Sequence, residues 1–194
     1  MEALKQAIER EGVGIGTEIV KVDGFLNHRI DVGLMERVGQ AFYEAFREER
    51  VDLILTVEAS GIAAALTTAQ AFGGIPVVFA KKGDRRNIGQ DVYAADVYSF
   101  THQRMNTIHV SKMWLPKGAR VLIIDDFLAN GEAIEGLMDI LRQAECELVG
   151  AGVCVEKGFQ PGGRRLRERG VRLVSLAVVK AIEDGKIQLE ESMR

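Results

Sequence analysis

The chain has 194 residues, of which 47% are hydrophobic and only 3 are proline, so it can bury a substantial core and favours a single globular domain. Its formal net charge of −3 gives no broad attraction to nucleic acid or to an anionic membrane. No apolar run approaches the roughly 18 residues that span a bilayer, and residues 1–10 read as a charged amphipathic helix rather than a signal peptide. We therefore expect a cytoplasmic protein without a nucleic-acid or membrane partner, in which any bound polyanion is small and held locally.

Cysteine and histidine usage gives little support to disulfide or metal chemistry. Cys146 and Cys154 are too few for a disulfide framework and lie in or beside an apolar stretch, so we expect buried, reduced thiols. His28, His102 and His109 have no ligand spacing with cysteines or carboxylates that would indicate zinc. The sequence therefore predicts no metal site built by the protein alone.

Apolar runs that resemble buried strands recur along the chain and alternate with segments of helical period. The predicted strands span residues 53–57, 76–80, 120–124, 148–155 and 171–176. Helical spacing predicts helices within residues 31–49, 62–72 and 132–144. In the first of these Leu34 and Val38 share a face, and Asp31 is a candidate N-cap. The pattern predicts an α/β fold with a twisted, mostly parallel sheet flanked by helices.

Residues 82–111 interrupt this alternation. The segment is largely polar and contains two short β-prone pieces, at 96–100 and 107–110. A segment of this length without a core pattern is usually functional or disordered in a compact domain. We expect a long flexible flap that carries a small antiparallel ribbon.

Two neighbouring acids, Asp125 and Asp126, follow the predicted strand 120–124. They stand where a buried parallel strand would leave the sheet, which is the edge at which open α/β sheets bind ligands. Residues 129–133 then lead into the next helix, and backbone N–H groups in such a turn can hold a phosphate with charge-assisted hydrogen bonds of about 1.5–3 kcal/mol each. By residue type alone, two acids that merely end a strand are an equally good interpretation.

The whole stretch 121–133 resembles the phosphoribosyl pyrophosphate (PRPP) motif of type I phosphoribosyltransferases, with four apolar residues, two acids and a loop of small residues. Most of that family has Thr-Gly-Gly-Thr in the loop, whereas this chain has Ala-Asn-Gly-Glu-Ala. A loop of this kind is similar to that of one purine-specific branch. Because hydroxyl donors are missing, backbone N–H groups and the Asn130 amide would have to bind the phosphate, and Glu132 is an unusual neighbour for it.

Residues 56–62, 22–31 and 155–162 resemble further parts of the same branch. The resemblance implies that Asp125 and Asp126 engage the ribose hydroxyls and stabilise the cationic ribosyl group. It implies a 5′-phosphate site at Ala129, Asn130, Gly131, Glu132 and Ala133. It implies a pyrophosphate site at Glu58, Ala59, Ser60, Gly61 and Lys81. It implies a base site at Val20, Phe25, Leu26, Asn27, Lys157 and Phe159.

The implied reaction is transfer of the 5-phosphoribosyl group of PRPP to a purine, and the implied base site favours xanthine. Lys157 offers only donors, which suit the carbonyl oxygens of xanthine and mismatch the amino groups of guanine and adenine. Transfer to guanine, hypoxanthine or adenine is the alternative, followed by a PRPP-sensing purine regulator, which would carry an extra DNA-binding domain. By residue type alone, structural interpretations are preferred: Ser60 as a helix cap, Phe25 as a core residue and Lys157 as a solvated lysine.

The resemblance also implies an organisation. Residues 1–194 would form one domain, with a base-recognition hood from about 1–50 and 157–194 and the flap as a lid. Mg²⁺ would arrive with PRPP rather than bind a dedicated protein site. A homodimer is implied, in which Lys81 either serves the pyrophosphate of a neighbouring subunit or is only a solvated charge. Successive strand residues point to opposite faces, so both acids reach one ribose only if the backbone turns at or after Asp125.

Overall fold

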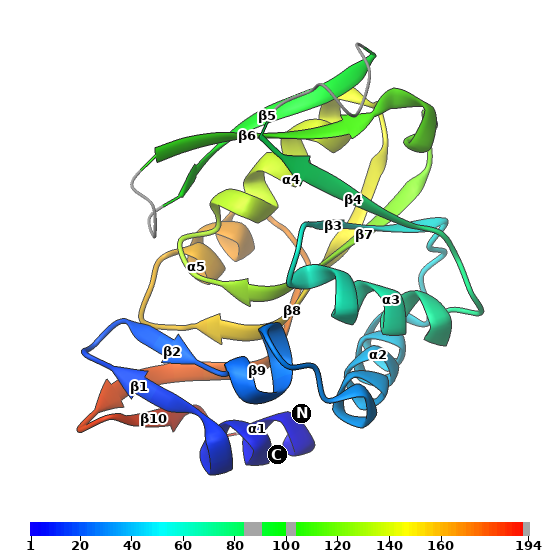
Figure 1. Cartoon of the computed structure of the whole chain (residues 1–194). Helices are drawn as coiled ribbons and strands as arrows, with labels where there is room; N and C mark the ends of the chain where they lie inside the picture. The colour runs from blue at the N-terminus through cyan, green and yellow to red at the C-terminus, as the bar shows by residue number, and fades with distance from the viewer. Residues whose placement is uncertain (84–90, 100–103, 192–194) are drawn as a thin grey trace.

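The computed structural model of the chain describes residues 1–83, 91–99 and 104–191. Within these ranges an eight-stranded sheet runs in the order β10-β9-β8-β7-β3-β4-β6-β5, beside a separate hairpin of β1 and β2 (Figure 1). The strands of the sheet are β3 (Leu53–Val57), β4 (Val77–Lys82), β5 (Val92–Ser99), β6 (Arg104–Ser111), β7 (Arg120–Leu128), β8 (Glu147–Lys157), β9 (Leu173–Glu183) and β10 (Lys186–Leu189). The strands of the hairpin are β1 (Val13–Ile15) and β2 (Ile19–Lys21).

The centre of the sheet is parallel. Strands β9, β8, β7, β3 and β4 pair side by side in the same direction. Antiparallel pairs lie at the two ends, with β10 beside β9 and the β5–β6 ribbon beside β4. All five residues of β3 are buried, as expected for a strand covered on both faces. The predicted α/β fold with a mostly parallel sheet is confirmed.

Several strands are longer than their apolar runs predicted. β7 continues to Leu128, past the predicted end at residue 124, and β9 continues to Glu183, past the predicted end at 176. The later residues of β9 alternate between buried and more exposed positions where the strand pairs with β10, so no continuous apolar run marks them. Apolar runs therefore locate the strand centres but miss the polar C-terminal ends.

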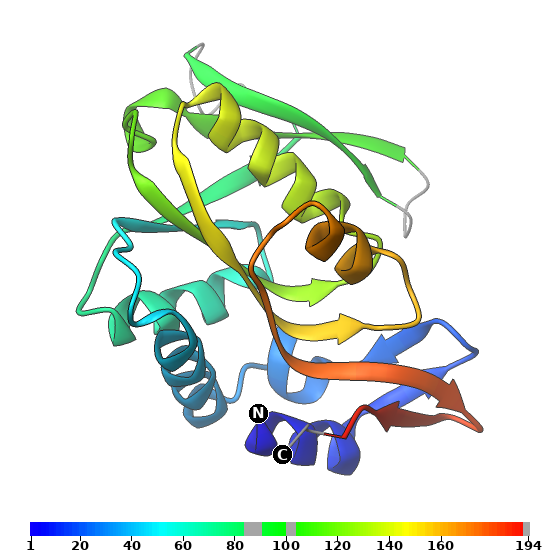
Figure 2. The same ribbon diagram turned by 180° about the vertical axis from the view of Figure 1, so that it is seen from behind.

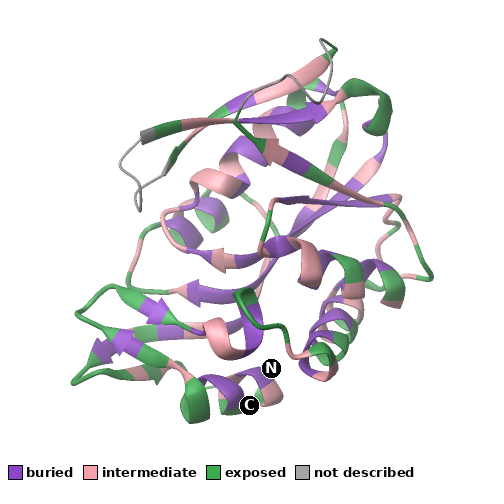
Figure 3. Cartoon of the chain, in the orientation of Figure 1, coloured by how far each residue is buried: buried purple, intermediate pink, exposed green. Residues whose placement is uncertain are grey.

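Helices cover both faces of the sheet (Figures 1 and 2). α2 (Val32–Phe46) and α3 (Gly61–Ala71) lie on one face with α1 (Glu2–Glu11), and α4 (Glu132–Gln143) lies on the other. Asp31 caps α2 as predicted, since its carboxylate accepts a hydrogen bond from the Leu34 N–H at 2.9 Å. In Figure 3 the buried residues line the side of each of these helices that faces the sheet or a neighbouring helix. Three predicted helices are thus present close to their predicted bounds.

Elements from both ends of the chain form a layer at the bottom of Figure 1, where α1, β1 and β2 pack beside β9 and β10. The Gly14 N–H donates to the Gly185 carbonyl at 3.0 Å, and the Met1 amine donates to the Leu176 carbonyl. A π-helical turn, Asp23–Asn27, leads away from the hairpin. The sequence did not predict β1, β2 or β10, because strands of three or four residues are too short for a period of two to stand out.

The flap, residues 82–111, contains the predicted antiparallel ribbon. β5 and β6 pair over eight residues each, so the ribbon is longer than the predicted pieces at 96–100 and 107–110. β6 also pairs with β4, and α4 packs against β5, which joins the ribbon to the body of the sheet. Residues 84–90 and 100–103, including the end of the first predicted piece, lie outside the described residues. The flexibility of the flap stays a prediction.

The two cysteines are free thiols in different surroundings. Cys154 is buried in β8, and burial together with the nearby acids raises the pKa of its thiol well above the usual range. Cys146 is only partly buried, so the expectation of a buried thiol was wrong there. Among the helices that the structure describes, none is long and apolar enough to cross a membrane.

Helices α2 and α3 cross at Gly39, where a Cβ would lie 2.4 Å from the Thr67 carbonyl carbon. We expect Gly39→Ala to lower the free energy of unfolding by about 1–3 kcal/mol, because neither backbone can yield without moving its helix. Gly33→Ala in the same helix is the matched control, since its Cβ would have 3.6 Å to the nearest atom and alanine favours a helix. Urea unfolding compares them, and equal stabilities would contradict the close crossing.

Candidate active site

The acid pair, Asp125 and Asp126, lies within β7 near the middle of the sheet. β3 leads onward to β4 on one side and β7 leads to β8 on the other, so the carboxyl ends of β3 and β7 form a switch point of the kind where open α/β sheets bind ligands. The strand does not end at the acids, as the sequence suggested, but pairs with β8 as far as Leu128. Both acids are buried, with 4% and 7% of their surface exposed. They are therefore strand-interior residues rather than exposed acids at a strand end.

The backbone of β7 changes its alternation at the acid pair. Ile124 and Phe127 both pack on the α2–α3 side of the sheet, whereas Ile123 and Leu128 pack on the α4 side. Strict alternation would place residues three positions apart on opposite faces. β7 thus runs on past Asp125 to Leu128, and its alternation shifts between Ile124 and Phe127.

Burial is the main cause that raises the pKa of Asp125 well above its usual range, and the negative charge of Asp126 is the second. The Lys82 ammonium acts in the opposite direction and lowers this pKa. The Asp125 carboxylate accepts a hydrogen bond from the Asp126 N–H at 2.9 Å, and Asp126 accepts one from the Asn27 amide at 3.3 Å. A carboxyl that keeps its proton to a higher pH, next to a second carboxyl, can both donate to and accept from hydroxyl groups. The acid pair is therefore chemically suited to the hydroxyls of a sugar.

The pyrophosphate segment, residues 58–61, connects β3 to α3 beside the acid pair. A Cβ at Gly61 would lie 2.7 Å from Asp125 Oδ1 and 2.3 Å from Thr56 Oγ1. Only glycine therefore lets the start of α3 come this close to Asp125. The structure brings the predicted pyrophosphate segment and the predicted catalytic acids together.

Side chains of the pyrophosphate segment are not used to cap α3. Ser60 stands at the N-cap but its hydroxyl makes no capping hydrogen bond, so capping does not account for it. The Glu58 carboxylate accepts a hydrogen bond from the Lys82 N–H at 2.6 Å. The segment is thus tied to the start of the flap, and the peptide bond between Glu58 and Ala59 is cis.

The phosphate loop, residues 129–133, joins β7 to α4. Gly131 is the N-cap of α4 and has a φ of 99°, a left-handed conformation that favours glycine. The Gly162 N–H donates to the Ala129 carbonyl at 3.1 Å, so helix α5 (Gly162–Glu168) begins directly against the loop. The sequence did not predict α5. The start of α4 has the geometry of an anion site, where unpaired N–H groups and the helix dipole favour negative charge.

The predicted base residues fall into two groups. Asn27 is exposed and reaches the acid pair, and Phe159, which follows β8, has 37% of its surface exposed. Three others are core residues with 8%, 2% and 1% exposed, namely Val20, Phe25 and Leu26. Core packing, the alternative given by residue type, accounts for these three in this structure. Their contact with a base stays a prediction.

Lys157 ends β8 and reaches across to the β1–β2 hairpin. Its ammonium donates to the Glu18 carbonyl at 2.8 Å. Partial burial lowers the pKa of Lys157 below its usual value, against the attraction of the Glu18 charge. Lys157 is therefore a half-buried donor held by one carbonyl oxygen, which differs from the freely solvated lysine that residue type alone suggested.

Two neighbouring lysines at the end of β4 lie on different sides. The Lys82 charge acts on Asp125, which places Lys82 on the side of the acid pair. Lys81 instead lines a surface groove of about 820 Å³ together with Phe79 and Trp114. The sequence argument considered both lysines for the pyrophosphate and settled on Lys81, and the role of Lys81 stays a prediction. Because successive residues of a strand point to opposite faces, alternation along the strand after residue 76 was the signal that distinguishes the side chain of Lys81 from that of Lys82.

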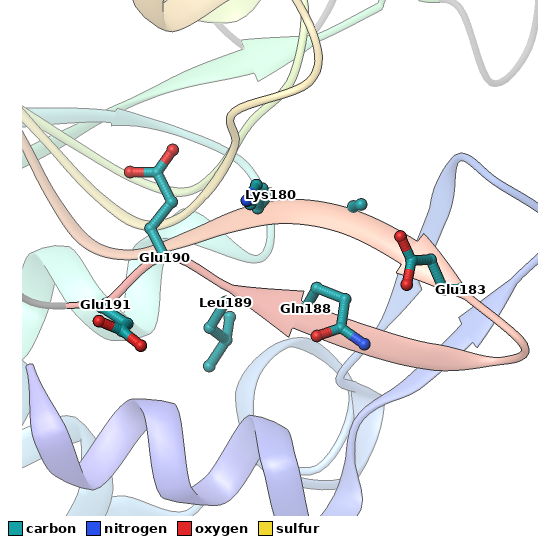
Figure 4. Close-up of a pocket in the computed structure, with 7 residues that line it drawn as sticks. Lys180, Glu183, Gln188, Leu189, Glu190 and Glu191 are labelled. Atoms are coloured by element: carbon teal, nitrogen blue, oxygen red, sulfur yellow. The ribbon is translucent and has the colours of Figure 1, made fainter.

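A second hollow, of about 610 Å³, lies on the β9–β10 hairpin (Figure 4). Its lining residues are Lys180, Ala181, Glu183, Gln188, Leu189, Glu190 and Glu191. None of them is a predicted site residue, and in Figure 4 the carboxylates of Glu190 and Glu191 point in different directions. Within residues 1–83, 91–99 and 104–191, no three His, Cys, Asp or Glu side chains gather as metal ligands.

Residues 33–184 match the family model of the phosphoribosyl transferase domain. The chain belongs to the phosphoribosyltransferase family. This confirms the family that the resemblance predicted, and the matched range includes the acid pair and the phosphate loop. The roles of single residues stay predictions.

Similar proteins cover nearly the whole chain. The xanthine phosphoribosyltransferase of Clostridioides difficile (strain 630) is 52% identical over 188 residues, which are 97% of this chain and 99% of that protein. The xanthine phosphoribosyltransferase of Laribacter hongkongensis is 50% identical over 187 residues, 96% of this chain and 98% of that one. Among solved structures, the adenine phosphoribosyltransferase of Rhodothermus marinus has a TM-score of 0.73 at 23% identity, covering 92% of this chain and 97% of that one. This last similarity supports the fold alone.

The raised pKa of Asp125 predicts a pH-dependent gain in stability on substitution. A carboxyl with a folded-state pKa above its unfolded value stabilises the fold only at low pH, and this contribution is lost as pH rises through the folded pKa. Asp125→Asn removes the titration and keeps an oxygen for the Asp126 N–H. We expect the variant to melt above the native protein at pH 8, by about 2–4 °C for each kcal/mol gained, with the difference smallest near pH 4.

Calorimetry across this pH range measures the effect, with Asp139→Asn as the control. The Arg142 side chain holds the pKa of Asp139 below its usual value, so loss of that carboxylate is expected to destabilise slightly at pH 8. A Tm for Asp125→Asn below that of the native protein at pH 8 would contradict the unfavourable burial of the Asp125 charge.

Proposed function

We propose that this protein is a xanthine phosphoribosyltransferase, which transfers the 5-phosphoribosyl group of PRPP to xanthine and releases xanthosine monophosphate and pyrophosphate in purine salvage. The observation that carries the proposal is the contact of Asn27, from the predicted base segment, with Asp126 of the acid pair at 3.3 Å. Relatives 50% and 52% identical over nearly the whole chain bear the name of this activity.

The chemistry breaks the bond between the anomeric carbon and pyrophosphate and forms a bond to a nitrogen of the base. Positive charge develops on the ribosyl group as pyrophosphate leaves, so positioning and electrostatics supply most of the acceleration. The acid pair would hold the ribose hydroxyls and stabilise that charge, while the phosphate loop holds the 5′-phosphate. The pyrophosphate segment would receive the leaving group, with the charge of Lys82 beside it. Closure of the flap would keep water out.

The donor set of the site fits Mg²⁺ carried on PRPP. The acid pair supplies two carboxyl groups, already engaged with the Asp126 N–H and the Asn27 amide. Mg²⁺ usually takes one or two carboxylates and completes its shell with substrate phosphates and water. Bound in this way, Mg²⁺ would neutralise charge on the departing pyrophosphate. The protein residues themselves then need only orient the ribose.

Base selectivity would rest on Lys157 and Asn27. The half-buried Lys157 ammonium can exchange the Glu18 carbonyl for a carbonyl oxygen of xanthine, which presents the same kind of acceptor. The amino group of adenine or guanine would leave donor facing donor at this position. Partial burial makes an unpaired ammonium costly, which sharpens the preference for an acceptor.

Nucleotide formation from PRPP with xanthine, guanine, hypoxanthine and adenine in parallel tests the proposal. We expect the highest kcat/KM with xanthine. Lys157→Met keeps the side-chain length and removes the donors, so kcat/KM for xanthine should fall about 10- to 100-fold, as for loss of one charged hydrogen bond, with KM for PRPP nearly unchanged. Lys21→Met on the exposed hairpin is the control. A kcat/KM for adenine above that for xanthine would refute xanthine specificity.

The organisation implied by the family motif is part of the same proposal. We propose one domain over residues 1–194, in which the layer built from residues 1–50 and 157–194 serves as the base-recognition hood. The packing of the β1–β2 hairpin on β9 and β10, and the reach of Lys157 to Glu18, support a hood that closes around the base. A cytoplasmic location and a mobile flap are retained as predictions.

We further propose that two copies associate through the groove lined by Lys81. The groove exposes large apolar side chains, with Trp114 60%, Met113 72% and Phe79 39% exposed. Such a cluster favours a protein contact over solvent. Because Lys81 lines this groove, it would serve a site in the second copy.

Light scattering during gel filtration tests the association. We expect a dimer for the native chain and a shift toward monomer for Trp114→Ser, because aromatic residues at the centre of an interface commonly contribute about 2 kcal/mol or more. Met105→Ser is the control, since Met105 is 59% exposed and lies outside the groove. A monomeric native protein, or an unchanged dimer for Trp114→Ser, would rule out this interface.

A further inference from the structure

The first turn of α4 combines an anion site with two acids. Glu132, within the phosphate loop, and Glu135, just after it, both stand in this turn. Acids near a helix N-terminus satisfy the helix dipole themselves. A phosphate bound at the same N-terminus would meet like charges a few ångströms away, and such repulsion is strong where water is excluded. The loop also lacks the hydroxyl donors that would offset it.

Arg165 of α5 lies against these two acids. Its Nη2 contacts both carboxylate oxygens of Glu135 at 2.7 Å, and its Nη1 lies 3.9 Å from the Glu132 carboxylate. Arg169 adds a second contact to Glu135 at 3.3 Å. Two acids in the turn are therefore matched by two guanidinium groups, one from α5 and one from the residue at its C-cap. The paired side chains are between 24% and 55% exposed, so they form a partly shielded group at the edge of the loop.

Arg165 also contacts the phosphate loop itself, because its Nη1 donates to the Asn130 carbonyl at 3.4 Å. The start of α5 is held against the same loop. A Cβ at Gly162 would lie 2.4 Å from the Ala129 carbonyl oxygen and 2.7 Å from the Gly131 nitrogen. Backbone contact at this distance fixes the position of α5 relative to the loop.

An ion pair with a buried carboxylate anchors α5 to the sheet. Glu156 of β8 is 4% exposed and accepts two hydrogen bonds of 2.7 Å from Arg167, together with one from the Ser175 hydroxyl. Burial tends to raise the pKa of Glu156, but these hydrogen bonds outweigh it and hold the pKa below the usual value. Leu166, which lies between Arg165 and Arg167 in the sequence, is fully buried. The helix that carries Arg165 is therefore rigidly seated, which suits a residue that must hold its charge in one place.

We propose that Arg165 is a positioning residue for the 5′-phosphate of PRPP. It neutralises Glu132 and Glu135 and holds the Asn130 carbonyl, so that the first turn of α4 presents its N–H groups to the phosphate without net negative charge. The inference rests on the proposed phosphoribosyl transfer. It assigns to α5, outside the PRPP motif, the charge balance that the loop does not supply.

Arg165→Gln tests this role. We expect KM for PRPP to rise about tenfold, as for one uncompensated charge near the phosphate, while kcat at saturating PRPP changes less than threefold. Arg164→Gln is the matched control, because Arg164 lies on the same short helix, is 76% exposed and pairs only loosely with Glu168 at 3.9 Å. Titration with ribose 5-phosphate measures the same phosphate affinity without turnover and should show the same tenfold loss for Arg165→Gln.

The double variant Arg165→Gln/Glu135→Gln separates charge balance from mere support of the loop. Removing the Glu135 charge together with its partner should restore KM for PRPP to within about threefold of the native value, because the repulsion disappears with the acid. A KM for Arg165→Gln within twofold of native, or a double variant no better than the single one, would overturn the proposal. If the native protein binds ribose 5-phosphate but forms no nucleotide, the proposed function fails while the role of Arg165 is still decided by the binding data.

Discussion

The burial of two adjacent carboxyl groups inside a parallel strand is the constraint on which the site depends. Asp125 and Asp126 are 4% and 7% exposed, so their surroundings must supply donors and room. The Asp126 N–H and the Asn27 amide supply hydrogen bonds, the Lys82 charge opposes the rise in the pKa of Asp125, and a glycine at position 61 supplies room. Burial makes ionisation of Asp125 unfavourable, and a sugar that offers hydroxyl hydrogens would relieve that cost. Burying these two carboxyl groups lowers the stability of the fold at the position where the proposed chemistry needs them.

The topology explains why the parts of the site meet. β3 and β7 are parallel neighbours, and the helices that follow them, α3 and α4, pack on opposite faces of the sheet. The pyrophosphate segment and the phosphate loop therefore lie at the same edge of the sheet. β7 and β8 extend beyond the residues that pair with β3, and the extension carries the acid pair and Lys157. The two ends of the chain then close around this edge, one through Asn27 and the other through Lys157 and its contact with Glu18.

Much of the fold and part of the site could be predicted from the sequence. Continuous apolar runs identify the central strands, because parallel strands covered on both faces leave no polar gaps, and the cap at Asp31 follows from local chemistry. The strand ends, the short strands β1, β2 and β10 and helix α5 could not be predicted, because they are stabilised by long-range contacts that leave little periodic signal. Strand alternation was needed to tell the side chain of Lys81 from that of Lys82. Residue type favours Phe25 as a core residue, and its burial agrees with that interpretation. Local pattern finds the loops but not which side chain faces them.

The phosphate loop shows how such a long-range contact changes the chemistry of a motif. A loop with hydroxyl donors can hold a phosphate with its own side chains, whereas Ala-Asn-Gly-Glu-Ala offers mainly backbone N–H groups at a helix end. Two acids in the following turn would cancel most of the attraction of that helix end, since each interacts with the dipole as strongly as a phosphate charge does. The loop can serve as an anion site only if those acids are neutralised from elsewhere, and the guanidinium groups nearest to them come from α5. Because α5 is anchored through Glu156, the residue immediately before Lys157, the same stretch of β8 supports both the phosphate loop and the predicted base contact.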